Sequence, residues 1–227
     1  MKKITFAAIF LLSLCLGLPQ QADAQIKQTN REVRVEMLTT AGKMVFVLYN
    51  DTPLHRDNFL KLVKDRTYDS LLFHRVIKNF MVQAGDPNSR RAKPGQMLGD
   101  GTLGYTVPAE FRKEHFHCKG ALCAARQGDN VNPEKASSAS QFYIVQGQVW
   151  DKNALDMMER RFGKTFTPQQ RDAYTTQGGS PHLDGDYTVF GQLVEGFEVL
   201  DKIASAPTGR ADRPVEDIRI ISVRVKK

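Results

Sequence analysis

The stretch that most constrains the fold of this chain is residues 73–87, with the sequence FHRVIKNFMVQAGDP. Two runs rich in β-branched and aromatic residues flank a short polar break, which is typical of two strands around a tight turn. Asn79 lies in the break, and asparagine tolerates the backbone geometry that tight turns require. The segment therefore predicts a β-hairpin, whose register decides which side chains share a face.

Two registers are open for this hairpin. A two-residue turn sets Arg75 opposite Val82. A three-residue connection instead sets Arg75 opposite Gln83. In the same register Ile77 lies opposite Met81. The second register gathers a guanidinium, an amide and a thioether on one face, which makes a small polar site beside an apolar surface.

Further strands are predicted by apolar alternation and by short continuous apolar runs. They cover residues 33–37, 44–49, 120–125, 140–146, 187–194 and 218–225. In the last of them the apolar phase slips between Ile220 and Ile221, which indicates a β-bulge. Strands outnumber helices and each hairpin has one apolar face. We therefore expect an antiparallel sheet closed into a barrel, with two helices capping its open ends.

Two helices accompany these strands. The first is expected to begin after Thr52, which caps it, with Pro53 in its first position. The inward-facing residues are Phe59, Leu60 and Val63 in this helix and Phe197, Leu200 and Ile203 in the second. Neither an internal repeat nor a second domain is apparent, so residues 31–227 are interpreted as one domain.

The hairpin segment resembles the signature of cyclophilin-type peptidyl-prolyl isomerases, F-H-R-V-I-x-x-F-M-x-Q-x-G-D, at every specified position. Further blocks match in order: SQFYI at 140–144, LDG at 183–185 and VFG at 189–191. The resemblance extends over most of the chain from residue 33 to residue 225. It implies a mainly β fold, a closed eight-stranded antiparallel barrel capped by two helices. It also implies isomerisation of X–Pro peptide bonds without a cofactor or a metal.

Prolyl isomerisation needs no nucleophile and no proton transfer. Its barrier of about 18–20 kcal/mol arises because the amide nitrogen shares its lone pair with the carbonyl group. A donor aimed at the prolyl nitrogen favours the twisted state, in which that lone pair becomes available. Arg75 suits this role because a guanidinium stays protonated and offers several N–H groups. An isolated strand arginine would by default be a solvent-exposed charge, but Gln83 across the strand and the full motif favour catalysis.

The resemblance also assigns the other residues of the site. Arg75 corresponds to the catalytic arginine. Gln83 belongs with it and, like Gln141, holds the substrate backbone. The positions implied to bind substrate are Phe80, Met81, Ala125, Arg126, Gln141, Tyr143, His182, Leu183 and Tyr187. Of these, the residues that match the proline pocket are Phe80, Met81, Tyr143 and Leu183.

Three of these positions depart from the common family pattern. Arg126 stands where asparagine is frequent, and because the backbone there binds substrate, the change is expected to matter little. His182 replaces a tryptophan, which removes an indole N–H and aromatic area, so binding of the family's cyclic peptide inhibitor is not expected. Tyr187 replaces a histidine of the groove and can still line the pocket and form a hydrogen bond.

Residues 148–179 form an insertion that smaller members of the family lack. Three apolar residues recur there at helical spacing: Leu155, Met158 and Phe162. Gly163 follows as a stop signal, and TPQQ at 167–170 is a capping box that opens a second helix. Because Tyr143 and Leu183 bracket the insertion, we expect it to border the substrate groove. The alternative is a helical excursion that buries only its own apolar side.

Removal of the insertion is expected to leave the barrel folded, because closure entropy changes slowly with loop length. Its cationic residues, Arg160, Arg161 and Lys164, are placed to meet acidic client proteins. On this view, deletion alters the binding of long unfolded substrates more than the turnover of a tetrapeptide.

Two further groupings are not favoured as sites. His115 and His117 share one face of an extended segment, but no carboxylate or further thiol obviously converges on them to complete a metal site. Ser180, His182 and Asp184 have the residue types of a hydrolase triad. Alternate positions of an extended segment lie about 6–7 Å apart, and a working triad needs hydrogen-bond reach.

The first residues have the pattern of a secretory signal peptide at 1–24. Lys2 and Lys3 form a basic region, residues 4–18 an apolar region, and Ala22-Asp23-Ala24 a small-residue cleavage site. The apolar region is too short for a membrane span. A lipoprotein anchored through Cys15 is the weaker alternative, because the preceding residue is a bulky leucine. The mature chain would be periplasmic or secreted.

The mature chain begins with a polar lead-in at 25–30. The full chain carries a net charge of +7, which favours solubility and some attraction to anionic envelope surfaces. No basic run with interleaved aromatic residues points to nucleic acid. Cys118 and Cys123, if extended between them, lie beyond disulfide reach, so two inert thiols are expected.

These observations predict an exported peptidyl-prolyl isomerase that acts, as a monomer, on proline-containing peptides and unfolded client proteins. The alternative is a proline-peptide binding module or holdase chaperone that kept the groove but has little isomerase activity. The intact set of Arg75, Gln83 and Gln141 favours catalysis.

Overall fold

The computed structural model describes residues 32–226. The predicted signal peptide at 1–24 and lead-in at 25–30 lie outside these residues. Eight strands form one antiparallel sheet: β1 (Val33–Thr39), β2 (Gly42–Leu48), β3 (Arg75–Ile77), β4 (Met81–Ala84), β6 (Ala121–Ala124), β8 (Phe142–Val145), β9 (Val189–Glu195) and β10 (Ile220–Lys226). β5 (Thr106–Val107) and β7 (Ser137–Ser138) form a separate pair. The helices are α2 (Pro53–Lys64), α3 (Lys152–Phe162), α4 (Pro168–Thr176) and α5 (Phe197–Ala204).

The large sheet is curled, and its strand order is β10–β1–β2–β9–β6–β8–β4–β3. Its edge strands β10 and β3 do not pair with each other, so the sheet is open and the predicted closed barrel is wrong in this respect. The reason is that β3 is only three residues long. The segment before β3 meets the start of β10 through isolated bonds instead. Leu72 forms a single bridge with Arg219, and Phe73 N donates to Ile218 O over 2.9 Å.

The predicted bulge in the last strand is confirmed. Leu38 pairs with Ser222 and the next residue, Thr39, pairs with Ile220, so that Ile221 is the extra residue on β10. A bulge shifts the alternation of side chains by one position. Ile220 and Val223 are accordingly both buried although they are three positions apart, and Ile221 between them is exposed.

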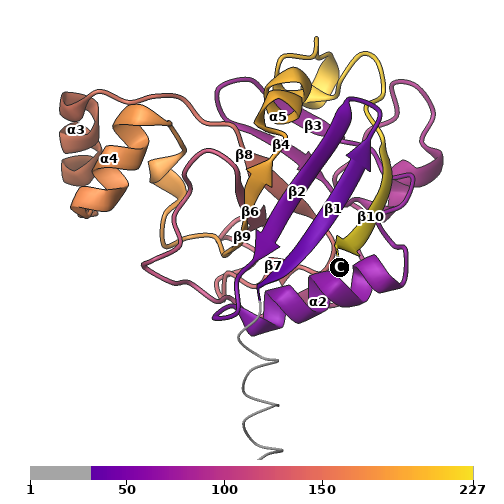
Figure 1. The fold of residues 1–227 in the computed structure, drawn as a ribbon, viewed down its shortest axis with the longest axis horizontal. Coiled ribbons are helices and arrows are strands. Elements are labelled where there is room, and N and C mark those ends of the chain that lie inside the picture. The colour runs from indigo at the N-terminus through magenta and orange to yellow at the C-terminus, as the bar shows by residue number, and fades with distance from the viewer. Residues whose placement is uncertain (1–31, 227) are drawn as a thin grey trace, which may run out of the picture. The chain divides into compact units, whose positions relative to one another are not determined.

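Two helices lie at opposite ends of β1 and β2, with α5 at the top and α2 at the bottom of Figure 1. The core packs their apolar stripes against the sheet. Phe59 of α2 contacts Phe142 of β8 and Phe190 of β9, with ring centroids 5.7 and 5.4 Å apart. From α5, Leu200 and Ile203 are fully buried, as predicted. Burial of this apolar surface is the main force that holds the helices on the sheet.

Two details of α2 differ from the prediction. Phe59 and Val63 are buried, but the third buried apolar residue is Leu62, whereas Leu60 is only half-buried. Thr52 precedes the helix as expected, yet its hydroxyl donates to the Tyr49 carbonyl over 3.5 Å and does not cap the helix.

The cap comes from Glu110, which is distant in sequence. Its carboxylate accepts from the backbone N–H groups of Leu54 and His55, at 3.1 and 2.9 Å. The same carboxylate lies 2.7 Å from Nδ1 of His55, whose Nε2 lies 2.9 Å from the Ser137 hydroxyl. A negative charge at a helix N-terminus is favourable, and here it also fixes the β7 segment beside α2.

The central hairpin has the three-residue register. Arg75 pairs with Gln83, and Ile77 pairs with Met81. Asn79 adopts a left-handed backbone with φ of 63°, which an asparagine adopts more readily than most residues. The guanidinium, the amide and the thioether are therefore on one face of the β3–β4 ribbon, as the second register requires.

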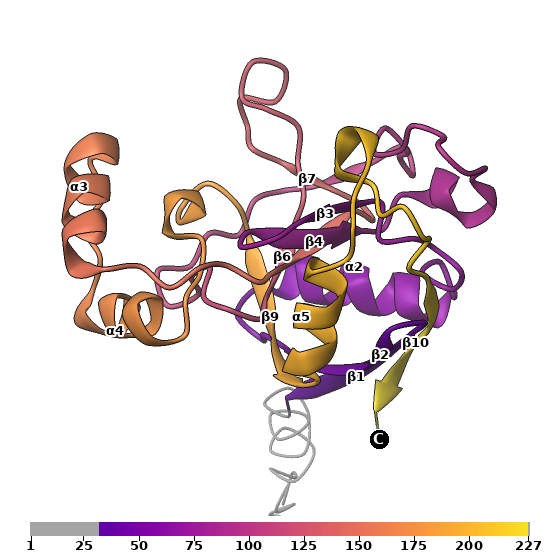
Figure 2. The same ribbon diagram turned by 90° about the horizontal axis from the view of Figure 1, so that it is seen from above.

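The insertion forms two helices, α3 and α4, which lie side by side and apart from α2 and α5 in both views (Figures 1 and 2). Gly163 ends α3 with φ of 61°, and Thr167 and Gln170 form both hydrogen bonds of the predicted capping box. The two helices bury a small core of their own, which comprises Leu155, Met158, Phe166 and Tyr174, with Phe116 and Trp150 packed against it.

The two ends of the insertion touch each other. Gly179 N donates to Gln148 O over 3.0 Å. A Cβ atom added to Gly147 would lie 2.3 Å from the Cα atom of Gly179, so only glycine allows this approach. The chain thus leaves and rejoins the sheet at one point. None of the helices within residues 32–226 is long and apolar enough to cross a bilayer.

Candidate functional site

A pocket of about 110 Å³ opens beside the central hairpin. It is lined by Arg75, Phe80, Met81, Gln83, Ala125, Arg126, Tyr143, Leu183 and Tyr187. The structure thus gathers nine of the eleven residues that the sequence predicted for the site, from four separate segments of the chain. The roles of these residues in catalysis and binding stay predictions.

The remaining two predicted residues lie next to the pocket. Gln141 lines an adjoining cavity of about 610 Å³, to which Gln83, Ala125 and Arg126 also contribute. His182 packs its ring against that of Phe80, a residue of the pocket lining, with centroids 5.6 Å apart. The pocket and the cavity adjoin each other, because three residues line both of them, and we call the two together the groove.

Sheet pairing explains how the groove is assembled. The neighbour of β4 is β8, and Gln83 lies directly opposite Tyr143 in that pair. Arg75 lies opposite Gln83 on the other side. Three site residues from three adjacent strands therefore lie in one row across the sheet. The short 3₁₀ turn Pro181–Leu183 adds Leu183 from a different segment.

Arg75 keeps most of its donors available. Its Nε atom lies 3.4 Å from the Asp212 carboxylate, which is its only hydrogen bond within residues 32–226, and its side chain is 43% exposed. A guanidinium has five N–H donors. The remaining groups can therefore reach a ligand in the pocket.

The two glutamines are oriented by a chain of hydrogen bonds. Gln83 Nε2 donates to Gln141 Oε1 over 3.1 Å. The Gln141 amide nitrogen in turn donates to the carbonyl groups of Gly99 and Gly101, at 2.8 and 2.9 Å. Because both donors of Gln141 are used, its oxygen is fixed towards Gln83. The loop around residues 99–101 thus determines how Gln83 faces the groove.

The floor of the pocket is apolar, and one of its walls is the side chain of Arg126. Met81 is fully buried, and Phe80 and Leu183 are half-buried around it. The guanidinium of Arg126 lies over the Tyr187 ring, 4.4 Å from its centroid, and its Nε donates to the Asp186 carbonyl over 2.7 Å. Arg126 therefore buries its side chain in the wall. This arrangement gives a small apolar space with a polar rim.

Burial keeps the pocket tyrosine protonated. The pKa of Tyr143 is well above its usual value because burial disfavours the phenolate. Its hydroxyl lies 2.9 Å from Nε2 of His117. His117 Nδ1 lies 2.8 Å from the Asp184 carboxylate. No sequence signal pointed to this His117–Asp184 pair, because 67 residues separate its members.

The structure assembles neither the predicted-unlikely metal site at His115 and His117 nor a hydrolase triad of Ser180, His182 and Asp184. Asp184 binds His117 and does not bind His182, so no hydrolase triad forms. His115 stacks on Tyr49 at 3.7 Å and binds Asp51. Within residues 32–226, no three His, Cys, Asp or Glu side chains are placed to hold a metal ion.

The two cysteines of the described chain are free thiols. Burial raises the pKa of Cys118 to about 11 and raises that of Cys123 well above its usual value. Thiols that stay protonated are poor nucleophiles. This agrees with the expectation of two inert cysteines.

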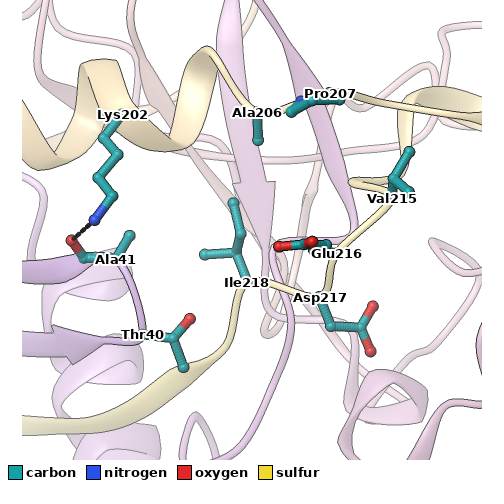
Figure 3. Close-up of a pocket in the computed structure, with 9 residues that line it drawn as sticks. All are labelled: Thr40, Ala41, Lys202, Ala206, Pro207, Val215, Glu216, Asp217 and Ile218. Carbon is teal, nitrogen blue, oxygen red and sulfur yellow. Dashed lines mark hydrogen bonds between the residues drawn. The ribbon is translucent and has the colours of Figure 1, made fainter.

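A separate cavity of about 510 Å³ lies between α5 and the start of β10 (Figure 3). Lys202 crosses its edge and donates to the Ala41 carbonyl over 3.3 Å. It contains none of the predicted site residues. One of its two carboxylates, that of Asp217, is already paired with Arg213 at 2.8 Å. The groove beside the hairpin is therefore the stronger candidate.

Comparison with known proteins gives a consistent result. The model of the family described as cyclophilin type peptidyl-prolyl cis-trans isomerase/CLD matches residues 34–225. A Staphylococcus epidermidis protein named as a peptidyl-prolyl cis-trans isomerase is 38% identical over 200 residues, which cover 87% of this chain and 94% of that protein. A Staphylococcus aureus protein of the same name is 37% identical over 198 residues, covering 86% and 93% of the two chains.

Solved structures show the same fold. The crystal structure of a cyclophilin-type isomerase from Cryptosporidium parvum has a TM-score of 0.65 to this chain and is 24% identical, over 87% of this chain and 99% of that one. A second structure of that isomerase, determined in the presence of the dipeptide Ala-Pro, has a TM-score of 0.63. On the extent of the family match and the identity to full-length relatives, this chain belongs to the cyclophilin-type peptidyl-prolyl cis-trans isomerases.

Proposed function

We propose that the chain binds the proline of an X–Pro segment in the pocket beside the hairpin and lowers the barrier to rotation with Arg75. The observation that carries this proposal is the row of Arg75, Gln83 and Tyr143 across three adjacent strands, above an apolar floor. A pyrrolidine ring is apolar and belongs on that floor. The guanidinium at the rim is then placed to donate to the prolyl nitrogen.

The catalytic advantage comes from the change at the prolyl nitrogen. In the planar amide the lone pair is delocalised, and in the twisted state it is free to accept a hydrogen bond. A fixed donor therefore binds the twisted state more strongly than either planar isomer. Among residues 32–226 the Arg75 guanidinium hydrogen-bonds only to Asp212, so its other N–H groups are available to the substrate. No covalent bond forms or breaks in this mechanism.

The adjoining cavity suits the residues that precede proline. Gln83 and Gln141 line this cavity. Gln141 holds the Gln83 amide in place, and Gln83 is positioned to bind an extended peptide backbone. Its walls include backbone and polar groups from residues 99–106 and 125–138. We expect this space to accept varied side chains, because it is larger and more polar than the proline pocket.

We further propose that the substrates are unfolded, exported proteins and that the enzyme works as a monomer. The signal-peptide pattern at residues 1–24 supports export. Mass spectrometry of protein recovered from the periplasm or medium is expected to find Gln25 at the N-terminus. A chain that keeps Met1, or that carries lipid on Cys15, would contradict this part of the proposal.

A protease-coupled assay with a tetrapeptide that contains one X–Pro bond tests the activity. Uncatalysed exchange takes tens to hundreds of seconds, so acceleration is easy to detect against a protein-free control. A parallel NMR titration with an Ala-Pro peptide measures binding. Binding without acceleration would replace the isomerase with a proline-peptide binding module or a holdase. Absence of both would reject the groove as the site.

A further inference from the structure

A line of four polar side chains connects the proline pocket to the helical insertion, and three of the four are buried while the Asp184 side chain is 12% exposed. It starts at the Tyr143 hydroxyl in the pocket wall and passes through His117 to Asp184. The second carboxylate oxygen of Asp184 accepts from the Tyr174 hydroxyl over 2.5 Å. Tyr174 lies on α4, within the insertion, and its side chain is fully buried. We call these four residues the relay.

A single arrangement of hydrogen bonds gives each polar side-chain atom of the relay a partner. The backbone N–H and Nδ1–H of His117 both donate to one oxygen of Asp184, at 2.9 and 2.8 Å. His117 Nε2 then accepts from the Tyr143 hydroxyl, and Tyr174 donates to the other oxygen of Asp184. The hydroxyl protons stay in place, because burial raises the pKa values of both Tyr143 and Tyr174. The relay therefore orients side chains and does not activate a nucleophile.

A second contact ties the insertion to the same wall of the pocket. Lys164, which follows α3, donates to the carbonyl groups of His182 and Asp184, at 2.8 and 2.6 Å. It also lies 2.9 Å from the Asp186 carboxylate. Leu183 lies between the two carbonyl groups that Lys164 binds. The ammonium thus fixes the segment that supplies Leu183 to the pocket.

The insertion is rigid enough to act as a support. Tyr174 packs edge-to-face against Phe116 and Phe166, with ring centroids 5.6 and 5.7 Å apart. At the surface of the two helices, Arg171 of α4 forms partly exposed ion pairs with Asp156 and Glu159 of α3, and these pairs include none of the four relay residues. Buried aromatic contacts of this kind stabilise beyond their buried area. The position of the Tyr174 hydroxyl therefore follows from the aromatic packing around its ring.

We propose that the insertion at 148–179 is a positioning module for the proline pocket, in which Tyr174 acts through Asp184 and His117 on Tyr143. This inference rests on the proposed isomerase function of that pocket. It changes the expectation from the sequence, in which deletion would spare the turnover of a tetrapeptide. A module that holds the pocket wall affects every X–Pro substrate, because each of them must place its proline against Tyr143 and Leu183.

The test replaces one hydroxyl at each end of the relay. Tyr174→Phe removes a single hydrogen bond and keeps the aromatic packing of the insertion. Tyr143→Phe does the same in the pocket. NMR exchange measurements give kcat and KM for the tetrapeptide, and thermal unfolding gives Tm. The matched control is Arg171→Gln, which breaks the ion pairs between α3 and α4 and leaves all four relay residues unchanged.

We expect Tyr174→Phe to lower kcat/KM by about 3- to 10-fold, mainly through a higher KM. This is less than a hydrogen bond to a charged group contributes directly, because Tyr174 acts on the pocket through two other side chains. Arg171→Gln is expected to lower Tm with kcat/KM within about twofold, because it breaks only partly exposed ion pairs. When Tyr143→Phe and Tyr174→Phe are combined, we expect the fold-loss in kcat/KM to be smaller than the product of the two single losses. The reason is that the effects of substitutions within one hydrogen-bond network are not additive.

Several results would overturn the proposal. Wild-type kcat/KM in Tyr174→Phe would show that the relay does not position the pocket. If Tyr174→Phe and Arg171→Gln lowered kcat/KM equally and in proportion to their decrease in Tm, the insertion would only stabilise the fold in general. Full additivity of the two effects on kcat/KM in the double variant would show that Tyr174 and Tyr143 are not coupled. These results presuppose an active wild-type chain, whereas background rates for wild type would reject the proposed function itself.

Discussion

The Nε atom of Arg75 lies 3.4 Å from Oδ2 of Asp212, 137 residues further along the chain. Asp212 sits in a short 3₁₀ turn, where its φ is 58° and that of Ala211 is 57°. Such left-handed conformations are uncommon for residues with a side chain. The turn thus presents a carboxylate to the guanidinium from outside the pocket, and both side chains stay more than 40% exposed.

Arg75→Lys tests the donor role. An ammonium keeps the charge but loses the planar fork of N–H groups. We expect kcat/KM to fall by about 10- to 1000-fold, or roughly 1.4–4 kcal/mol of transition-state stabilisation, with Tm unchanged. The protease-coupled assay and a thermal melt measure both quantities. A near wild-type rate with normal melting would mean that the donor is another residue.

Asp212→Asn tests whether Asp212 only orients the Arg75 side chain or takes part in catalysis. The amide keeps an acceptor oxygen, and asparagine tolerates positive φ. Because exposed ion pairs contribute only about 0–1 kcal/mol, we expect Tm to change little and kcat/KM to change by less than about fivefold. A loss as large as that of Arg75→Lys would instead place Asp212 within the catalytic machinery.

Gln141→Glu probes the hydrogen bonds that orient Gln83. A carboxylate cannot donate to the carbonyl groups of Gly99 and Gly101, so one half-buried and one buried acceptor lose their partner. We expect a loss of about 1–3 kcal/mol in the free energy of unfolding, measured by urea denaturation. The control is Gln127→Glu, an exposed glutamine on the rim of the same cavity. Similar losses in both variants would show that charge alone is responsible.

Stability is expected to fall below about pH 6.5. Burial lowers the pKa values of His55 and His74 in the folded chain, whereas unfolded histidines titrate near 6.5. The unfolded state therefore binds protons first as the pH falls. Stability declines from pH 6.5 down to the folded pKa values, by up to about 1.4 kcal/mol per pH unit for each histidine.

The variant His74→Leu removes one of these titrations and keeps a similar volume. Urea unfolding at pH 7.5, 6.5 and 5.5 compares its slope with that of wild type. We expect a shallower decline in the variant. An unfolding free energy that is constant over this range in the wild-type chain would contradict the burial argument.

Short-range features of the fold followed from the sequence. The hairpin register, the bulge at Ile221 and the capping box at Thr167 each depend on a few neighbouring residues, whose backbone preferences agree with one another. The family motif then identified most of the groove. It did so because the hairpin and β8 are adjacent strands, and pairing alone brings their side chains into one row.

Long-range polar contacts did not follow from the sequence. Glu110 caps α2 from 55 residues away in place of Thr52, and Asp184 binds His117 across 67 residues. Such pairs depend on the path of the connecting chain, which local patterns do not specify. The closed barrel was wrong for a related reason. Closure depends on how far the edge strands extend, and β3 is only three residues long.

The contact between Gly147 and Gly179 has a consequence for the history of this protein. A segment whose ends coincide can be gained, lost or exchanged in one genetic event, since the neighbouring strands need not be rerouted. Selection can then change the two helices without disturbing the sheet. Under the relay proposal, an exchange of this segment alters the support of the pocket beside the hairpin, while the strands that build the groove stay as they are.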